Sequence, residues 1–371
     1  MKKSLLFFLI LNLFALPLRA EELSDAETYR AVYEKLQTGY IKPQPASDSA
    51  LMVLKALPAV DRKLRVADDE KRVSLYYDAR VVRSFLKPEN PEDVNASLKL
   101  TIRVLKAAQD VSNKVKEKDF ELADILLENG INDGLDGDSK YYPAFGAEKK
   151  GLLKNRRHFA ARMIDDVLYM KIGAFNKFTL NNLRKAAEDH PQARAAVLDL
   201  RGSPGGLFSQ AVDIADAFLD EGIIASEHGR NENRLKYYNA HTGDILAGRP
   251  LAVLIDGGTM SSAEVVAAAL KEQSRAKLIG TDSFGKGTRQ DLSELPNGAE
   301  LGCTAAYIYT PSGQKLDKLG VSPDVCTFNM GDGRRLEDVL NRSQPQQCGR
   351  EDRERRNLDL EAAVKLLKER I

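Results

Sequence analysis

Residues 251–290 read LAVLIDGGTMSSAEVVAAALKEQSRAKLIGTDSFGKGTRQ, and this stretch decides the fold. The apolar run from Leu251 to Ile255 predicts a strand, a Gly-rich turn follows it, and Ser261 and Ser262 begin an apolar helix pattern. A serine at such a turn lies at the positive end of a helix. There a hydroxyl is readily exposed, and a neighbouring N–H can hold an oxyanion.

A second loop follows a second strand pattern in the same stretch. Lys277 to Ile279 predicts a short strand, which leads into Gly285-Lys286-Gly287 and then to Gln290. A lysine between two glycines carries its amine on a backbone that can bend into a crowded site. The two loops therefore offer one hydroxyl and one amine at the ends of two strands.

The second loop also has a phosphate-binding interpretation. Gly280 to Lys286 matches the first seven positions of the P-loop pattern GxxxxGK. The next position must be Ser or Thr to hold magnesium, and here it is Gly287. The following TRQDLSELPNG is not a helix pattern that could face phosphates. We therefore expect no nucleotide and no other cofactor.

Strand and helix patterns alternate from Met163 onward, which predicts α/β layers with loops gathered at the carboxyl ends of the strands. The run AAVLDL is nearly continuous in apolar residues, as in buried parallel strands. It leads into a third Gly-bearing loop, Arg201 to Gly206. Strands are expected at 167–172, 195–200, 223–225, 251–255 and 277–279, and helices at 179–190, 209–219 and after Ser261.

The region before this core reads as a mostly helical lobe, residues 21–133. Helices are expected at 26–40, 95–116 and 119–129, and the segments 73–77 and 81–86 are expected to be strand and helix fragments. A packing or dimerisation role is the interpretation we favour for this lobe. The C-terminal segment, 331–371, ends in a helix pattern at 357–371 that would pack on the core or on a second subunit.

The first twenty residues, MKKSLLFFLILNLFALPLRA, have the three parts of a secretory signal peptide. Two lysines precede an apolar run, and a small residue, Ala20, precedes two glutamates. We expect cleavage near Ala20 and a periplasmic or secreted mature protein. An uncleaved membrane anchor is the alternative.

The composition indicates which classes of partner to expect, and the cysteines indicate a disulfide. The 371 residues are 43% hydrophobic, and 55 basic against 54 acidic residues give no reason to expect nucleic acid. Three cysteines allow one disulfide and one thiol. We favour Cys326 with Cys348 as a surface disulfide, and Cys303 as a small buried residue in a strand. The spacing fits no zinc site.

Two other candidate chemistries are poorly supported by the residues. Asp133, Asp136 and Asp138 form an acidic run in a turn, but the run lacks the alternate-position pattern and closing glutamate of a calcium loop, so we expect turn carboxylates and no metal. The four histidines lie away from the strand-end loops, and two of them are expected in a polar insertion between strands. They are His158, His190, His228 and His241.

A serine with a lysine as its base is the arrangement that remains. It requires an uncharged lysine, which an apolar and water-poor pocket favours. Phe284 and the helix after Ser261 are the expected source of that pocket. A Ser-His-Asp triad stays open, because sequence distance alone does not exclude it.

At these residues the chain resembles the carboxyl-terminal processing peptidases, or tail-specific proteases. GTMSSAEVVAAAL and TDSFGKGTRQ are similar to that family's GS/TASASE and TFGKGxxQ motifs. In the same order along the chain, GLDGDSKYY resembles GLDPHSxYL, YMKIGAFN resembles YIRIxxF, LDLRGSPGGLFSQ resembles LDLRxNPGGLL, and TAAYIYTPSGQKLDKLGVSPDV resembles TxARYYTPSGRxIxxxGIxPD. The resemblance covers roughly residues 134–325.

The resemblance implies a crotonase-like (ClpP/crotonase) layered α/β core and an exported serine endopeptidase that cleaves polypeptides, with C-terminal tails as one option. Ser261 would be the nucleophile, Lys286 the general base and Gln290 the residue that orients the lysine. Backbone N–H groups would form the oxyanion hole, those of Ser262 and of a glycine, with Gly206 preferred over Gly205.

The sequence departs from the family pattern in two places. Family members carry a PDZ domain, which needs about 80 residues, between the GLDPHS turn and the YIRI strand, and here only residues 147–166 lie between Gly146 and the strand. We therefore expect a PDZ-less member, with residues 134–166 as a turn-rich connector and 167–330 as the catalytic core. The signature also reads Met260-Ser261-Ser262-Ala263, so Ser262 is the alternative nucleophile.

A different class of function stays open beside the protease. The alternative is a catalytically inactive exported binding or scaffold protein that uses the same groove and the helical lobe. The partners expected are polypeptide substrates, with an adaptor or lipoprotein and a homodimer through the lobe as further options.

Overall fold

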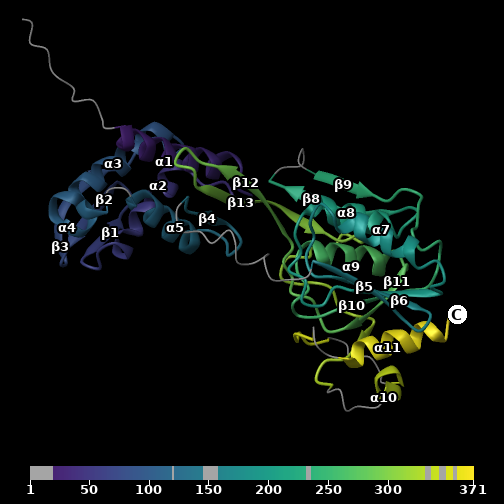
Figure 1. Cartoon of the computed structure of the whole chain (residues 1–371). Coiled ribbons are helices and arrows are strands. Elements are labelled where there is room, and N and C mark those ends of the chain that lie inside the picture. Colours follow the sequence, from purple (N-terminus) through teal and green to yellow (C-terminus); the bar gives the residue numbers. More distant parts are fainter. Residues whose placement is uncertain are drawn as a thin grey trace, which may run out of the picture.

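The computed structural model describes residues 20–118, 121–144, 158–230, 235–330, 336–341, 348–353 and 357–371. Two bodies, an N-terminal lobe and an α/β core, are joined by a long β-hairpin (Figure 1). The expected signal peptide, apart from Ala20, lies outside the described residues, as does the part of the expected connector at 145–157. No helix among the described residues is long and apolar enough to cross a membrane.

The core is built on a six-stranded sheet with the order β14-β11-β10-β7-β6-β5. Every neighbouring pair is parallel except β5 with β6 at one edge. The central strands β7 and β10 are buried along their whole length because helices cover both faces, as their apolar sequences predicted. The strands are β5 (Phe159–Ile164), β6 (Val167–Ile172), β7 (Ala195–Asp199), β10 (Leu251–Ile255), β11 (Ala276–Gly280) and β14 (Val325–Cys326).

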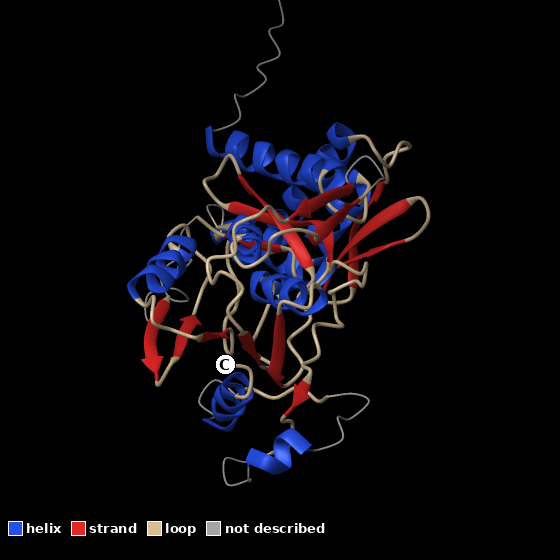
Figure 2. Ribbon diagram, turned by 90° about the vertical axis from the view of Figure 1, so that its right-hand side faces the viewer, coloured by secondary structure: helices blue, strands red, loops and turns tan. Residues whose placement is uncertain are grey.

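The two faces of this sheet pack into two separate apolar clusters. Along β6, Leu168 and Met170 enter the cluster formed with α7 (Thr179–Asp189), α8 (Phe208–Asp216) and α9 (Ser262–Glu272). Val167 and Tyr169 enter the cluster with α10 (Leu336–Asn341) and α11 (Asn357–Lys368). Successive strand residues point to opposite faces, so one strand supplies both clusters. Figure 2 shows the resulting helices on either side of strands.

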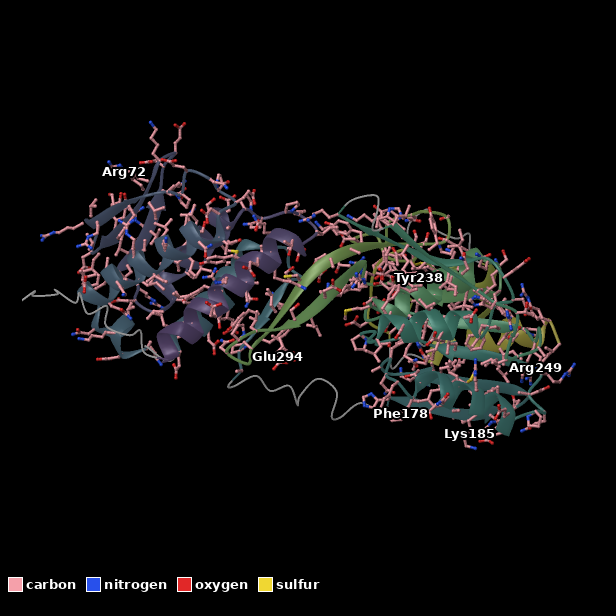
Figure 3. The ribbon with its side chains drawn as sticks, turned by 90° about the horizontal axis from the view of Figure 1, so that it is seen from above. Arg72, Phe178, Lys185, Tyr238, Arg249 and Glu294 are labelled. Carbon is pink, nitrogen blue, oxygen red and sulfur yellow. A yellow bond between two sulfur atoms is a disulfide. The ribbon has the colours of Figure 1, made fainter. Side chains whose placement is uncertain are left out.

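A second, antiparallel sheet connects the core to the lobe. It contains β8 (Ile223–Gly229), β9 (Leu235–Asn239), β12 (Thr288–Glu294), β13 (Glu300–Tyr309) and β4 (Lys140–Tyr142), which pairs with β13. The β12–β13 hairpin leaves the core, and Figure 3 shows Glu294 at the end that lies against the lobe. Leu295, Leu301 and Cys303 are part of the apolar cluster of the lobe. One hairpin therefore belongs to both bodies.

The lobe is mostly helical, as expected, but it also contains a three-stranded antiparallel sheet. The segment 81–86, expected as a helix fragment, lies in a strand instead. Asp78 and Ala79 both have positive φ, 47° and 65°, which is the backbone of a two-residue hairpin turn without the usual glycine. The elements are α1 (Ala20–Thr38), α2 (Ala46–Lys55), β1 (Leu64–Asp68), β2 (Arg72–Tyr77), β3 (Arg80–Leu86), α3 (Val94–Val111), α4 (Asn113–Glu117) and α5 (Leu122–Gly134).

The cysteines pair as the sequence suggested, but the disulfide expected at the surface is buried, with Cys326 3% and Cys348 8% exposed, because Cys326 lies in β14 of the core sheet. Cys326 and Cys348 form a disulfide across 22 residues. Cys303 is fully buried in β13, and burial raises the pKa of its thiol to about 12. His228 was expected in a polar insertion, but it lies within β8, where its ring stacks on Tyr309. The sequence predicted a strand only at 223–225. Strand β8 continues through the polar residues Ser226 and Glu227, which have no alternating apolar pattern to indicate a strand.

Candidate active site

A pocket of about 540 Å³ lies where the two loops and the hairpin meet. Four of the expected site residues line it: Gly206, Ser261, Lys286 and Gln290. The turn between α5 and β4, the loop after β7 and strands β12 and β13 complete the wall. A second cavity of about 450 Å³ lies in the lobe between α2 and α5 and contains none of the expected residues.

Ser261 caps the N-terminus of α9 with an unusual backbone. Its φ is 54° and its ψ is −119°, a conformation that costs a non-glycine residue free energy. Surrounding contacts must therefore hold it. The Ser261 side chain reaches the pocket, whereas the next serine points elsewhere.

Ser262 is 1% exposed, and its hydroxyl donates a 2.9 Å hydrogen bond to the carbonyl of Gly206. This bond joins the start of α9 to the loop after β7. Because Ser262 is the first residue of the helix, its N–H has no acceptor within the helix. The Ser262 backbone thus faces the glycine loop, while its hydroxyl is engaged in the hydrogen bond to Gly206.

Glu264, which the sequence analysis did not single out, connects both candidate loops. Its Oε2 accepts hydrogen bonds from the backbone N–H groups of Ser261 and Lys286, each 2.8 Å long. Its Oε1 accepts from the N–H of Gly285 and the hydroxyl of Ser283. The backbones at 261 and 286 therefore lie within two hydrogen-bond lengths of each other. The spacing Ser261-x-x-Glu264 is a capping-box pattern, which is the signal that could have indicated this residue.

Burial raises the pKa of the Glu264 carboxyl above its ordinary value, while the hydrogen bonds from Ser283, Gly285, Ser261 and Lys286 act in the opposite direction. Glu264 is fully buried. A buried acceptor left without donors is costly, so these four donors are what allow a carboxylate at this position.

The glycine pair at the end of the third loop is required by close packing. A Cβ at Gly206, where φ is 147°, would lie 2.1 Å from the backbone oxygen of Phe175. A Cβ at Gly205 would lie 2.8 Å from the backbone nitrogen of Ser262. Only glycine allows the loop to approach the serine turn this closely.

Buried ion pairs hold the beginning of the same loop. Arg201 donates to Asp199 at 2.8 Å and to Asp359 of α11 at 3.2 Å, and all three side chains are at most 3% exposed. Burial tends to raise the pKa of Asp199, but Arg201 outweighs it, helped by Lys171 and Tyr169, so the pKa is lower than usual. The C-terminal helix therefore supports the site loop through Arg201.

The segment that follows Cys348 braces the other two loops. The carbonyl of Glu351 accepts from the N–H of Gly257 and from the hydroxyl of Thr281. The guanidinium of Arg350 donates to the carbonyl of Ser283, and the N–H of Arg353 donates to Asp256. These contacts reach the residues just before Ser261 and just before Lys286, and they were not foreseen from the sequence.

Lys286 and Gln290 are connected through two other residues. Lys286 Nζ lies 3.5 Å from Asp138 Oδ1, and the hydroxyl of Thr288 donates to the other oxygen of Asp138. The Gln290 side-chain amide donates a 2.8 Å hydrogen bond to the Thr288 hydroxyl. Lys286 thus forms an ion pair with Asp138, which was expected from the sequence to be only a turn carboxylate.

The apolar surroundings of the site come in part from other residues than expected. Phe284 does not line the pocket: its side chain is 45% exposed, with the Arg350 guanidinium over the ring. Apolar lining comes instead from Leu207, Phe208 and Val265 and from Ile308 of β13. None of the residues that line the pocket is a histidine.

Asp133, expected in a turn, lies near the end of helix α5, and Asp136 and Asp138 lie in the turn that follows the helix. Asp136 Oδ1 accepts hydrogen bonds from the N–H groups of Asp138 and Ser139. Within the described part of the chain, no group of three or more His, Cys, Asp or Glu side chains is arranged to hold a metal ion.

Comparison with known proteins agrees with these features. Residues 166–327 match the family model described as Peptidase family S41. This part of the chain is similar to peptidase family S41. A carboxy-terminal-processing protease of Bartonella bacilliformis is 39% identical over 170 residues, and the carboxy-terminal processing protease CtpA of Bacillus subtilis is 35% identical over 164 residues. The expected resemblance to the processing peptidases is confirmed.

The alignments with these two relatives cover only part of each protein. The two alignments span 44% and 42% of this chain, and 39% and 34% of the two relatives. A solved lipoprotein from Streptococcus agalactiae shares the fold of nearly the whole chain, covering 97% of it and 100% of the lipoprotein, with a TM-score of 0.56 and 14% identity. The likeness in fold to the lipoprotein thus extends beyond the residues that match the family model.

Proposed function

We propose that the chain is a serine endopeptidase with Ser261 as nucleophile and Lys286 as general base. The observation that carries the proposal is the shared acceptor: the backbones of Ser261 and Lys286 bond to the same oxygen of Glu264, and both residues line one pocket. A serine and an amine held at one site are the two groups that this mechanism needs. Protease relatives in family S41 support the same activity.

The reaction would proceed by acyl transfer. Uncharged Lys286 takes the proton of the Ser261 hydroxyl, and the oxygen attacks a peptide carbonyl. The N–H groups of Ser262 and Gly206, with Gly205 as the alternative to Gly206, hold the oxyanion. Lys286 then gives its proton to the leaving amine, and water releases the acyl group from Ser261. Gln290 would hold the lysine during these steps.

Two further observations favour Ser261 over its neighbour. The strained backbone of Ser261 is the kind of outlier that is concentrated at functional sites. The Ser262 hydroxyl is buried and donates to Gly206. Leu207, Phe208 and Val265 line the pocket, and a side chain of the polypeptide substrate would contact them there. Segments near C-terminal tails are one proposed class of substrate.

The proposal also includes the location of the protein and its partners. We propose export after cleavage near Ala20 to a periplasmic or extracellular location, and the disulfide supports an oxidising compartment. The layered core would be crotonase-like, and access to the pocket would be controlled without a PDZ domain. An adaptor or lipoprotein partner, or a homodimer through the lobe, would bring the substrate to the pocket.

The decisive experiment uses the mature chain and an unfolded protein such as casein. Ser261→Ala and Lys286→Ala are each expected to abolish cleavage without changing the far-ultraviolet circular dichroism spectrum. Ser262→Ala, which leaves the proposed nucleophile in place, is expected to retain activity. Turnover by purified Ser261→Ala would refute the assignment. A parent chain that binds but never cleaves polypeptides would favour the inactive binding protein.

A further inference from the structure

Asp138 and Lys286 form an ion pair inside the pocket, and this contact carries a further inference. Lys286 Nζ lies 3.5 Å from Asp138 Oδ1, and the two side chains are 32% and 28% exposed. Both residues line the same pocket as Ser261. The Lys286 amine, which the proposed mechanism needs as a base, is therefore in an ion pair with Asp138 in this structure.

Asp138 is held in place from the side of the lobe. It lies in the turn between α5 and β4, where Asp136 accepts its backbone N–H. The next residue, Ser139, is fully buried, and its hydroxyl oxygen accepts a hydrogen bond from the N–H of Thr304 in β13. Strand β4 then pairs with β13. The carboxylate is thus anchored to the sheet that continues into the site.

The second oxygen of Asp138 also has a partner in the site. Thr288, two residues after the lysine, donates its hydroxyl to Asp138 Oδ2. Gln290 donates its amide to Thr288. The amide that would hold Lys286 during catalysis is therefore occupied by Thr288 in the same arrangement that pairs Lys286 with Asp138.

A lysine paired with a carboxylate is held as an ammonium ion, which has no lone pair and cannot accept the proton of Ser261. We propose that Asp138 is a positioning residue that keeps Lys286 in a resting state. Catalysis then requires Lys286 to leave Asp138 and lose its proton. This inference rests on the proposed role of Lys286 as the base.

Other charges around Lys286 are distributed over several elements. Two cations line the pocket, and carboxylates lie on α9 and on the loop whose backbone packs against Gly287. These groups are Lys140 on β4, Arg289 on β12, Glu264 on α9 and Asp317 on the loop before β14. Glu264 bonds the backbone of Lys286, and Asp317 pairs with Lys315. Asp138 is the carboxylate in the described part of the site that contacts the Lys286 amine.

The first test measures rate against pH for Asp138→Asn. A pair exposed to this extent is screened by water, so its loss should raise kcat at neutral pH by roughly two- to fivefold. The pH at which the rate reaches half of its maximum should fall, and KM should stay the same. Asp133→Asn, a neighbouring exposed carboxylate outside this pocket, is the matched control and should behave as the parent. A lower kcat, or an unchanged pH profile, overturns the proposal.

A milder variant guards against misfolding of Asp138→Asn. Thr288→Val removes the hydroxyl that donates to Asp138 and leaves the ion pair itself. It should shift the pH profile in the same direction by a smaller amount, because Asp138 loses the hydroxyl that holds it beside Lys286. A shift in the opposite direction contradicts the proposal.

The second test does not depend on proteolysis. Lys286 is acylated with an amine-reactive succinimidyl ester in the Ser261→Ala background, and its labelling rate is measured by mass spectrometry, with exposed Lys185 as the internal reference. Asp138→Asn should increase labelling of Lys286 by the same two- to fivefold. Equal labelling overturns the role of Asp138 even if cleavage is established. Faster labelling in a chain that cleaves nothing supports that role and refutes the proposed function instead.

Discussion

The backbone N–H of Lys286 donates a 2.8 Å hydrogen bond to Oε2 of Glu264, a fully buried carboxylate 22 residues earlier in the chain. The same oxygen accepts from Ser261. Glu264 lies in the first turn of α9, so the helix that presents the serine also holds the lysine loop. This single side chain explains how two loops from different strands keep one relative position.

Replacement of that carboxylate should be severe. In Glu264→Gln one acceptor oxygen becomes an NH2 group that faces N–H donors, so at least one buried donor loses its partner. We expect kcat/KM to fall by at least about a hundredfold and the free energy of unfolding to fall by about 2–3 kcal/mol. Glu188→Gln, on the exposed face of α7, is the control and should change neither. Full activity in Glu264→Gln would remove Glu264 from the account of the site.

The glycine loop offers a matched pair of substitutions. In Gly206→Ala the new Cβ would lie 2.1 Å from the Phe175 oxygen, whereas a Cβ added at Gly243, with a similar φ of 151°, would meet no atom within 4 Å. We expect Gly206→Ala to lose activity and about 3 kcal/mol of unfolding free energy. Gly243→Ala should lose about 1 kcal/mol and keep activity. Denaturant unfolding and casein cleavage measure both, and equal behaviour would mean that backbone contact at Gly206 is unimportant.

The disulfide should matter for activity as well as for stability, because the segment after Cys348 bonds the loops that precede Ser261 and Lys286. Reduction, or the double change Cys326→Ala and Cys348→Ala, should lower the unfolding free energy by about 2–4 kcal/mol. Cleavage should slow as the brace loosens. Cys303→Ala removes a buried thiol and keeps the disulfide, so reductant should slow its cleavage as much as that of the parent. If the reduced parent kept its activity and its free energy of unfolding, residues 349–353 would hold the two loops without the disulfide.

Acid should weaken the buried pair at the start of the glycine loop. The pKa of Asp199 is lowered in the folded chain and lies near its ordinary value of 3.8 in the unfolded chain, so the unfolded state binds a proton first as the pH falls. The stability contribution of Asp199 is therefore complete above about pH 4 and is lost below it. Asp199→Asn should show a smaller decrease of unfolding free energy between about pH 5 and pH 2. Exposed Asp189→Asn is the control, and identical slopes in the parent and Asp199→Asn would contradict this assignment.

Local patterns were sufficient for the core strands and for the residues that carry the proposed chemistry. Strand β10 was expected at its observed bounds because an apolar run between turn residues leaves little choice, and the Gly-flanked lysine and the serine turn follow from chain spacing alone. The lobe sheet was harder. Its β2–β3 turn uses Asp78 and Ala79 with positive φ, and no glycine marked it.

The sequence by itself determined which groups are available: a serine at a helix start, a lysine in a flexible loop, glycines where backbones meet, and cysteines that can pair. Only the tertiary structure decided what these groups contact. The shared bond to Glu264, the brace from residues 349–353 and the pairing of Lys286 with Asp138 each join segments distant in the chain. Such contacts depend on how helices and sheets pack in three dimensions. The number of residues between two side chains along the chain does not determine the distance between them in the folded protein.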